Sequence, residues 1–359
     1  MSTRQSPVNR TLALSSDFTS ASFTKGKPSS QDLTVCEVMI DNCRVHLTAS
    51  PLCSREPPFV VPGGDTCALS PPLLKSVLQK AVRRRSPRSA VAAATELLLK
   101  DPAALLRRLP VIAVEDVGIV GGQFCFLVWA MVAWTKVGAE GMTKHLGGWE
   151  RRVLEVVSAM AGTSVRCAKH REKGEGEGVG GEGEGEGGNL KDCVDSVVAC
   201  VLIRRQYGGM KGDIAMMNKF ASLEGLRRDD VRHSARLCDG VERRFGESVG
   251  GWGEGSEVVW RNASKMKLDE PIRMTRGNVC ELGVDFHVSS IVEDVVAGGD
   301  EEIAKVKGWM WKFESGVNFK RIIDGGREGG EEEGKEEYER VWKGRMMKWR
   351  KAYLERRLR

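Results

Sequence analysis

Asp285 and His287 lie two residues apart in a stretch where apolar residues alternate with polar ones. The alternation of Val284, Phe286 and Val288 predicts a short extended segment that places both polar side chains on one side. A carboxylate beside an imidazole is suited to acid–base catalysis or to metal binding. No second histidine-rich or acidic cluster completes a site, so a histidine hydrogen-bonded at the edge of the core is the alternative, and no metal or cofactor is expected.

The segment YGGMKGD at residues 207–213 is the best candidate for an anion site. Its glycines allow the backbone to approach a ligand closely, and Lys211 adds a positive charge. Asp213 is predicted to cap a following helix, whose first N–H groups would face the same anion. A tight turn between two helices, with glycines required for geometry alone, is the alternative. The residues of this candidate site are Gly208, Gly209, Lys211 and Gly212.

The C-terminal segment has the strongest electrostatic pattern, because basic residues dominate from position 343 onward and only Glu355 opposes them. Aromatic and methionine residues recur there at helical spacing, which predicts an amphipathic helix. Such a helix is suited to bind a phosphate backbone, an anionic membrane surface or a calmodulin-like groove, or to dock on the core with its charges solvated. The stripe consists of Trp342, Met346, Trp349 and Tyr353. The candidate binding residues are Lys343, Arg345, Lys348, Arg350, Lys351, Arg356 and Arg357.

The elements that position these residues are predicted to be mainly helical. Residues 73–119 contain three amphipathic segments in succession, separated by the helix-start signals Ser86-Pro87 and Asp101-Pro102. Pro110 interrupts the third segment, but the apolar pattern resumes at once. A kinked continuation of that helix is therefore expected.

Further helices are predicted at residues 149–160 and 190–205, where apolar residues again recur at helical spacing. A capping box from Ser290 to Glu293 and an N-cap at Asp300 predict two more.

Two further charged groups lie in the helical region. Glu115-Asp116 is more typical of a cap or an internal ion pair than of a catalytic dyad, and Arg107 and Arg108 are the expected partners. A second basic cluster lies on or just after the first helix, where it predicts a nucleic-acid patch, an import signal or a solvated helix end. Its members are Arg83, Arg84, Arg85 and Arg88.

Residues 73–135 resemble the C-terminal helical region of the replication-associated recombination AAA+ ATPases, which are relatives of clamp loaders. The matching pieces are LLKSV, SAVAAATELL, DPAALLRRL and AVEDVGI, the last at residues 113–119. In that family the region follows the ATPase core and supports oligomerisation, so the resemblance implies a helix-on-helix assembly surface and a possible role in self-association. The chain has no GxxxxGK[ST] loop to hold nucleotide phosphates, so a motor of that type is excluded.

Composition gives the broad class. The chain has 359 residues, a formal net charge of +6 and 42 glycines, many of them in acidic runs. Its ten cysteines form no CxxC pair, which favours a reduced compartment and idle thiols. The start of the chain has no apolar signal segment, so nuclear or cytoplasmic localisation is expected, with an organellar transit peptide as the alternative. The apolar run at 124–134 is too short to span a membrane and predicts a buried core helix, so no integral membrane span is expected.

The expected fold is mainly α, a multi-helix array with a small N-terminal β-hairpin around Asp41-Asn42 and disordered acidic Gly/Glu insertions. The predicted organisation is a disordered tail at 1–32, a hairpin and proline-rich connector at 33–68, a helical core at 69–322 with a disordered insertion at 174–188, and an acidic linker with the basic helix at 323–359.

The leading hypothesis is a non-catalytic binding or scaffold protein that engages nucleic acid or a replication-type protein complex. An enzyme with a site built from the 207–213 loop, Asp285 and His287 is the second hypothesis. A peripheral membrane protein held by its C-terminal helix is the third.

Overall fold

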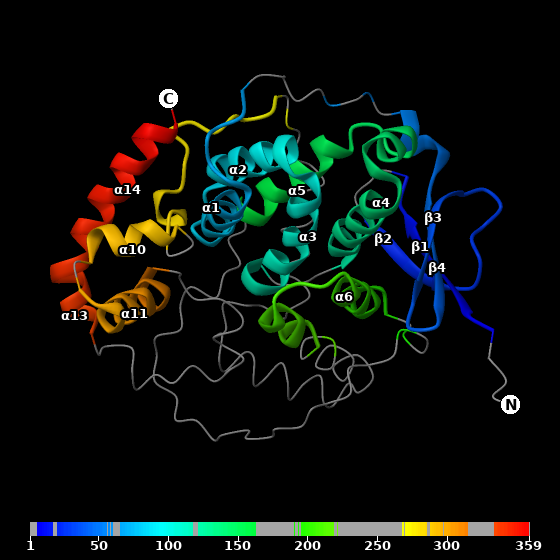
Figure 1. The fold of residues 1–359 in the computed structure, drawn as a ribbon. Helices are drawn as coiled ribbons and strands as arrows, with labels where there is room; N and C mark the ends of the chain where they lie inside the picture. The colour runs from blue at the N-terminus through cyan, green and yellow to red at the C-terminus, as the bar shows by residue number, and fades with distance from the viewer. Residues whose placement is uncertain are drawn as a thin grey trace, which may run out of the picture.

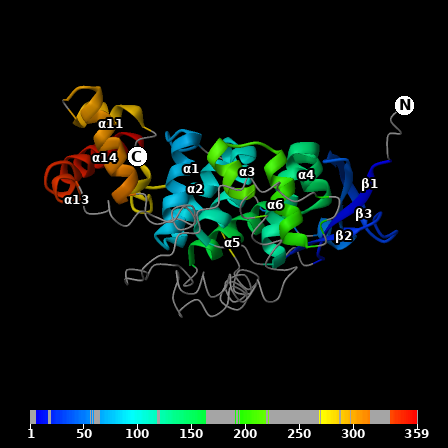
Figure 2. The same ribbon diagram turned by 90° about the horizontal axis from the view of Figure 1, so that it is seen from below.

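The fold was examined in a computed structural model of the whole chain. The structure describes residues 6–16, 20–55, 57, 59, 65–117, 121–162, 190, 193, 195–218, 221, 268, 270–285, 288–296, 298–314 and 334–358. The described part is mainly α-helical with a small N-terminal sheet, as the sequence predicted. Figure 2 shows the sheet at one end, the helices α1 to α6 in the middle and the C-terminal helices at the other end.

Four strands form the sheet: β1 (Val8–Leu14), β2 (Ala21–Lys25), β3 (Leu33–Ile40) and β4 (Cys43–Ala49). Their order is β2-β1-β4-β3, with β1 and β4 parallel and the other two pairs antiparallel. The hairpin predicted around Asp41-Asn42 is β3–β4, and both turn residues have positive φ (45° and 61°), as a tight hairpin turn requires.

The prediction of a disordered tail at residues 1–32 is wrong, because β1 and β2 lie within it. β1 pairs with β4 along its whole length, from Val8 opposite Cys43 to Leu14 opposite Ala49. Leu12 of β1 and Phe23 of β2 are buried, so this serine- and threonine-rich segment completes the core. The predicted hairpin is therefore half of a larger sheet.

Three successive helices follow: α1 (Pro71–Arg83), α2 (Pro87–Lys100) and α3 (Pro102–Ile112). Asp101 caps α3 as predicted, since its side chain accepts a hydrogen bond from the Ala104 N–H at 2.9 Å. Ser86 makes no cap hydrogen bond to α2 and donates instead to the Ser89 hydroxyl. The apolar stripes of all three helices are buried inside the chain.

Pro110 lies inside α3, and the chain continues directly into η2 (Ala113–Val117), a single π-helical turn. This is the kinked continuation that the sequence predicted. A proline removes one backbone donor from the helix, and a wider turn is one way for the backbone to adapt. The turn places the side chains of Glu115 and Asp116 opposite α1.

The longest helix, α4 (Gly121–His145), contains the apolar run at 124–134 and bends at Gly138, whose φ is 64°. The side chains from Phe124 to Ala133 are buried between the sheet and the other helices (Figure 1). The Trp129 indole donates to the Thr48 carbonyl of β4 at 3.1 Å. None of the helices in the described residues is long and apolar enough to cross a membrane.

Two more helices complete the middle of the molecule. The helix α5 (Trp149–Gly162) begins where the sequence predicted and ends two residues later than predicted. The helix α6 (Ser196–Gln206) begins later than predicted, because the Asp195 side chain accepts hydrogen bonds from the N–H groups of Val197 and Val198 and fixes the start there. The acidic glycine run at 174–188 lies outside the described residues.

The C-terminal helices pack against the side of α1 that is remote from the sheet (Figure 1). They are η3 (Glu281–Gly283), α10 (Ser289–Val295), α11 (Asp300–Trp309), η4 (Met310–Glu314), α13 (Lys335–Glu337), η6 (Tyr338–Trp342) and α14 (Lys343–Arg357). The last three, α13, η6 and α14, follow one another without a break and form one long C-terminal helix. The predicted boundary at 322/323 lies outside the described residues.

The caps predicted for two of these helices are wrong. The helix α10 is preceded by Val288 and has no side-chain cap, so Ser290 and Glu293 form no capping box. In α11 the capping position is Gly299, and Asp300 is the first helical residue. The carboxylate of Asp300 still lies in the first turn, where it suits the positive end of the helix dipole. In the predicted extended segment at 284–288, Val284 and Asp285 form a bend after η3, and residues 286 and 287 lie outside the described residues.

Candidate functional site

One side of α14 is buried against the rest of the chain. Met346, Arg350 and Leu354 recur every four residues, and none of them is more than 1% exposed. This side packs on α10 and η3. The helix is therefore docked on the protein body, which was one of the alternatives that the sequence left open, but this buried side shares only Met346 with the predicted stripe.

Arg350 is the polar anchor of this docked side. Its Nε donates to the Val284 carbonyl at 2.6 Å, and its terminal nitrogens form a two-pronged ion pair with the Glu314 carboxylate. The side chain is 0% exposed. The prediction that Arg350 binds an external partner is therefore wrong, because its helical position turns it toward a carboxylate inside the protein.

The opposite side of α14 forms what we call the basic face. Its four residues are Arg345, Lys348, Lys351 and Arg356, and all four side chains are exposed. Lys348, Lys351 and Arg356 make no hydrogen bond or ion pair with other described residues. The basic face therefore presents cations to solvent on a helix whose other side is fixed.

The remaining predicted binding residues lie at the two ends of this face. Lys343 is exposed and pairs with Glu339 one turn earlier, at 3.3 Å. Arg357 is exposed, lies over the Tyr353 ring and donates to the Ala68 carbonyl at 3.4 Å. Glu355, the one acidic residue of the helix, pairs with Arg276 at 2.5 Å, so its charge is already balanced.

The aromatic stripe lies between the buried side and the basic face. Trp342 is 6% exposed, whereas Trp349 and Tyr353 are half-buried. The Trp349 indole donates to the Asp294 carboxylate of α10 at 3.0 Å, and its ring stacks on Tyr353 with centroids 5.0 Å apart. The stripe thus packs mainly against the protein itself.

The 207–213 loop has the geometry of a turn. Gly208 and Gly209 have φ values of 73° and 147°, which explains why glycine is required at both positions. Arg204, at the end of α6, donates to the carbonyl of Gly208 at 2.5 Å. Lys211 is exposed and is the first residue of the next helix. The structure thus gives these glycines a conformational role, which was the alternative interpretation.

Asp213 does not cap the helix that follows the loop, as the sequence had suggested. Residues 211–218 are helical, and the N–H of Ile214 bonds to the Met210 carbonyl, so the helix begins before Asp213. The Asp213 side chain instead accepts a hydrogen bond from Arg108 of α3 at 3.2 Å. The Asp213 carboxylate therefore forms an ion pair that joins the 211–218 helix to α3.

Asp285 is buried beside α1 and lies 2.6 Å from the Lys80 ammonium. Its carboxylate also accepts a hydrogen bond from the Ser76 hydroxyl at 3.0 Å. Burial lowers the pKa of Lys80, and the Asp285 charge opposes that shift. His287 lies outside the described residues. Asp285 therefore contacts α1 residues, whereas the 207–213 loop contacts α6 and α3.

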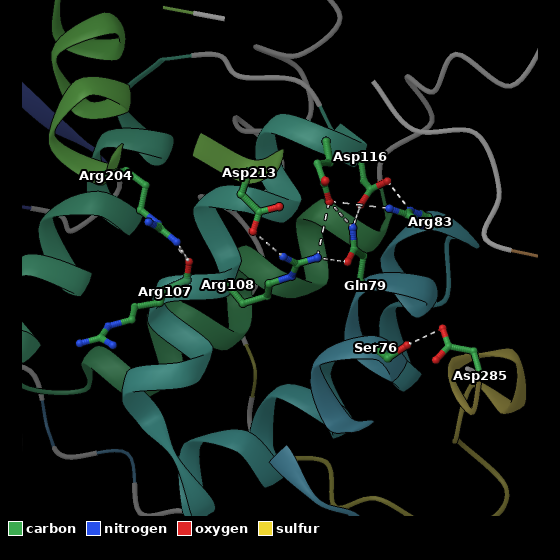
Figure 3. Close-up of polar contacts among 10 residues, drawn as sticks. Ser76, Gln79, Arg83, Arg107, Arg108, Asp116, Arg204, Asp213 and Asp285 are labelled. Atoms are coloured by element: carbon green, nitrogen blue, oxygen red, sulfur yellow. Dashed lines mark hydrogen bonds and ion pairs between the residues drawn. The ribbon is translucent and has the colours of Figure 1, made fainter. Parts of the chain in front are cut away.

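A network of buried charges joins α1, α3 and η2 (Figure 3). The side chain of Gln79 donates to both Glu115 and Asp116 and accepts from Arg108. Arg83 lies 2.5 Å from Asp116, whose side chain is 0% exposed. Burial raises the pKa of Glu115, against the opposing effect of Arg108.

The expected internal ion pair of Glu115-Asp116 is confirmed, but only one expected partner takes part. Arg108 lies 3.6 Å from Glu115. Arg107 contributes its backbone carbonyl, which accepts two hydrogen bonds from Arg204. Reasoning from the sequence missed Arg83 and Gln79, because their contact with η2 depends on how α1 and α3 pack.

The second basic cluster is divided between the interior and the surface. Arg83 belongs to the buried network, and Arg84 donates to the Glu314 carbonyl. Arg85, with a φ of 54°, and Arg88 are exposed at the turn between α1 and α2. Only part of this cluster is available to an external anion.

Metal binding and thiol chemistry find little support. Within the described residues, no group of three His, Cys, Asp or Glu side chains is arranged to hold a metal ion. Burial raises the pKa of Cys36 to about 11 and that of Cys280 above its ordinary value. A raised pKa keeps a thiol protonated and less nucleophilic, which fits the expectation of idle thiols.

Comparison with known proteins adds no assignment. A scan against protein-family models, a search of curated proteins and a search of solved structures each found no match to this chain. The resemblance of residues 73–135 to the recombination ATPases stays a prediction. What the fold and the site define is a class: a mainly helical protein with a docked C-terminal helix that presents a basic face.

Proposed function

We propose that the protein binds the phosphate backbone of a nucleic acid through the basic face of α14. The observation that carries this proposal is the contrast between the two sides of one helix. Met346, Arg350 and Leu354 fix the helix on the protein body, while the four cations of the basic face stay exposed. Because the helix is already fixed, its backbone needs no further ordering when its cations contact phosphates, and each contact releases counterions.

The orientation of the aromatic stripe favours a nucleic acid over a membrane. A helix that lies on a membrane inserts its apolar face into the boundary of the lipid. In α14 this face is occupied by the protein itself, since Trp342 is 6% exposed and Trp349 is bonded to Asp294. The same argument weighs against a calmodulin-like groove, which would need the apolar face to be free.

The enzyme hypothesis has weaker support than nucleic-acid binding. The Asp285 carboxylate pairs with the Lys80 ammonium and accepts a hydrogen bond from the Ser76 hydroxyl, so it lies within a buried ion pair. Lys211 is the first residue of a helix that follows a turn, and the positive φ values of Gly208 and Gly209 explain the glycines of that turn. A nucleophile, a base and an orienting group within hydrogen-bonding reach are what catalysis requires, and these residues do not supply that arrangement.

The test is a binding titration of the full chain with a labelled oligonucleotide, followed by fluorescence anisotropy. The test variant changes the four residues of the basic face to Gln. The control variant removes the same charge from four exposed cations elsewhere, Lys25, Lys27, Arg44 and Lys211. We expect the test variant to weaken binding about 100-fold at 0.1 M salt and the control to change it less than about threefold.

Three results would overturn the proposal. Equal losses in the two variants would show that net charge, and not α14, governs binding. Absence of oligonucleotide binding by the wild-type chain would remove the function. Binding to phosphatidylserine vesicles without binding to oligonucleotides would favour the membrane surface instead.

A further inference from the structure

A row of aromatic rings and guanidinium groups runs along one flank of α14, next to the basic face. The Arg345 guanidinium lies over the Trp342 ring, 5.3 Å from its centroid. Further along the helix, Trp349 stacks on Tyr353 with an angle of 15° between the ring planes. Arg357 then lies over the Tyr353 ring at 5.3 Å.

The row is ordered by contacts within the protein. Trp342 is buried, and Trp349 is held by its hydrogen bond to Asp294 at 3.0 Å. Arg345 and Arg357 are exposed, so each guanidinium has a ring on one side and solvent on another. Flat groups fixed in this way can stack with little further loss of side-chain entropy.

The row and the basic face run along the helix in parallel. Arg345 and Arg357 are separated by about 18 Å along the axis, at 1.5 Å per residue. That length corresponds to about five stacked nucleotides at roughly 3.4 Å each. The side chains of Lys348 and Lys351 project from the basic face between these two ends. A strand lying along α14 would therefore meet cations and flat groups over the same length.

We propose that the nucleic acid bound by α14 is single-stranded, with its phosphates on the basic face and its bases on the arginine–aromatic row. This inference rests on the proposed function. Bases in a single strand have free faces, and stacking on aromatic rings and guanidinium planes is the main sequence-tolerant way in which proteins bind them. In a duplex the faces of the bases are stacked on neighbouring bases, so the arginine–aromatic row would find no free base face on which to stack.

The composition of α14 weighs against sequence reading in a duplex groove. The helix sequence KGRMMKWRKAYLERR contains no Asn, Gln, Ser or Thr, so its polar side chains could read a base edge only through arginine or lysine contacts to guanine. Its exposed side chains are cations apart from the paired Glu355 and two small residues, Gly344 and Ala352. The helix is thus suited to bind without strong sequence preference.

The experiment uses the full chain and a double variant that keeps the charge while removing the planar groups, Arg345→Lys with Arg357→Lys. Lysine retains the contact with phosphate but lacks the flat guanidinium. The control is Arg44→Lys with Arg340→Lys, which changes two exposed arginines that lie outside the basic face and over no ring within the described part of the chain. The probes are labelled oligothymidylate, a duplex of the same length and heparin.

We expect the test variant to bind oligothymidylate about tenfold more weakly, because stacking contributes roughly 1–3 kcal/mol per base. Its binding to the duplex and to heparin should be unchanged, and the control variant should match the wild type on all three probes. Equal wild-type affinity for single strand and duplex, or an equal loss on all probes, would overturn this inference and leave the proposed function standing. If the wild-type chain bound none of the three probes, the proposed function would be overturned as well.

Discussion

Two arginines of the helical core, on α1 and α3, and two outer arginines of α14 all lie on amphipathic helices, but their surroundings are opposite. Arg83 and Arg108 face the carboxylates of η2, so their charges are balanced inside the protein. Arg345 and Arg356 face solvent and meet no carboxylate within the described residues. The residue type alone does not distinguish these two pairs of arginines.

The difference shows that the angle of a side chain around its helix decides the role of its charge. Arg350 makes the point within one helix, since it is 0% exposed and bound to Glu314 while Arg345, five residues earlier in the chain, is exposed. Burial of a cation requires a partner, because the cost of desolvation is offset only by a close opposite charge. Cations without such a partner are the ones left for binding.

The largest expected effect comes from breaking the anchor of α14. In Glu314→Ala, Arg350 loses its carboxylate while its side chain stays buried, so we expect the free energy of unfolding to fall by about 3–5 kcal/mol. Chemical denaturation measures this change. The control is Glu339→Ala, which removes the exposed partner of Lys343 and should cost less than about 1 kcal/mol. Similar losses in the two variants would contradict the assignment of Arg350 to the interior.

A smaller effect is expected at two glycines, one that faces α1 and one on the outer side of α14. A Cβ atom at Gly283 would lie 2.4 Å from the Cα atom of Val77 in α1, so Gly283→Ala should destabilise by about 1–3 kcal/mol. At Gly344, on the outer side of α14, a Cβ atom has nothing within 4 Å. Gly344→Ala should therefore stabilise the helix by about 0.5–1 kcal/mol. Thermal unfolding of both variants would show opposite shifts, and shifts of the same sign would argue against this packing.

The smallest effect concerns the buried network and is a dependence on pH. Burial raises the pKa of Glu115 above its ordinary value of 4.5, so the folded chain keeps this proton at pH values where the unfolded chain has lost it. The contribution of Glu115 to stability therefore falls as the pH rises from about 4.5 through the folded pKa. Glu115→Gln has no such proton to lose, so its stability relative to the wild type should increase over that interval. Denaturation curves at several pH values test this, and a decrease would contradict it.

Much of the local structure could be predicted because its signals lie within a few residues. Asp41 and Asn42 tolerate positive φ, Asp101 caps the helix that begins at Pro102, and Pro110 disturbs the helix that contains it. Each effect depends on the residue and its immediate neighbours. The same reasoning failed at Asp213, where a capping residue by type is used as an ion-pair partner of Arg108.

The long-range contacts could not be predicted from the sequence. The pairing of β1 with β4 joins strands separated by β2 and β3, and the apolar pattern of β1 gives no sign of its partner. The partner of Arg83 is Asp116 on another element, and the partner of Arg350 is Glu314 beyond a break in the described chain. The sequence predicted seven binding residues in the C-terminal segment, and packing removed Arg350 from that group.

The dependence of binding on salt tests the central claim most directly. For a single strand, the slope of log affinity against log salt concentration is about −0.7 for each phosphate contact, so four contacts on the basic face predict a slope near −3. In the variant with all four residues changed to Gln, the slope should approach zero, while the control variant lacking Lys25, Lys27, Arg44 and Lys211 should keep the wild-type value. An unchanged slope in the basic-face variant would contradict the account.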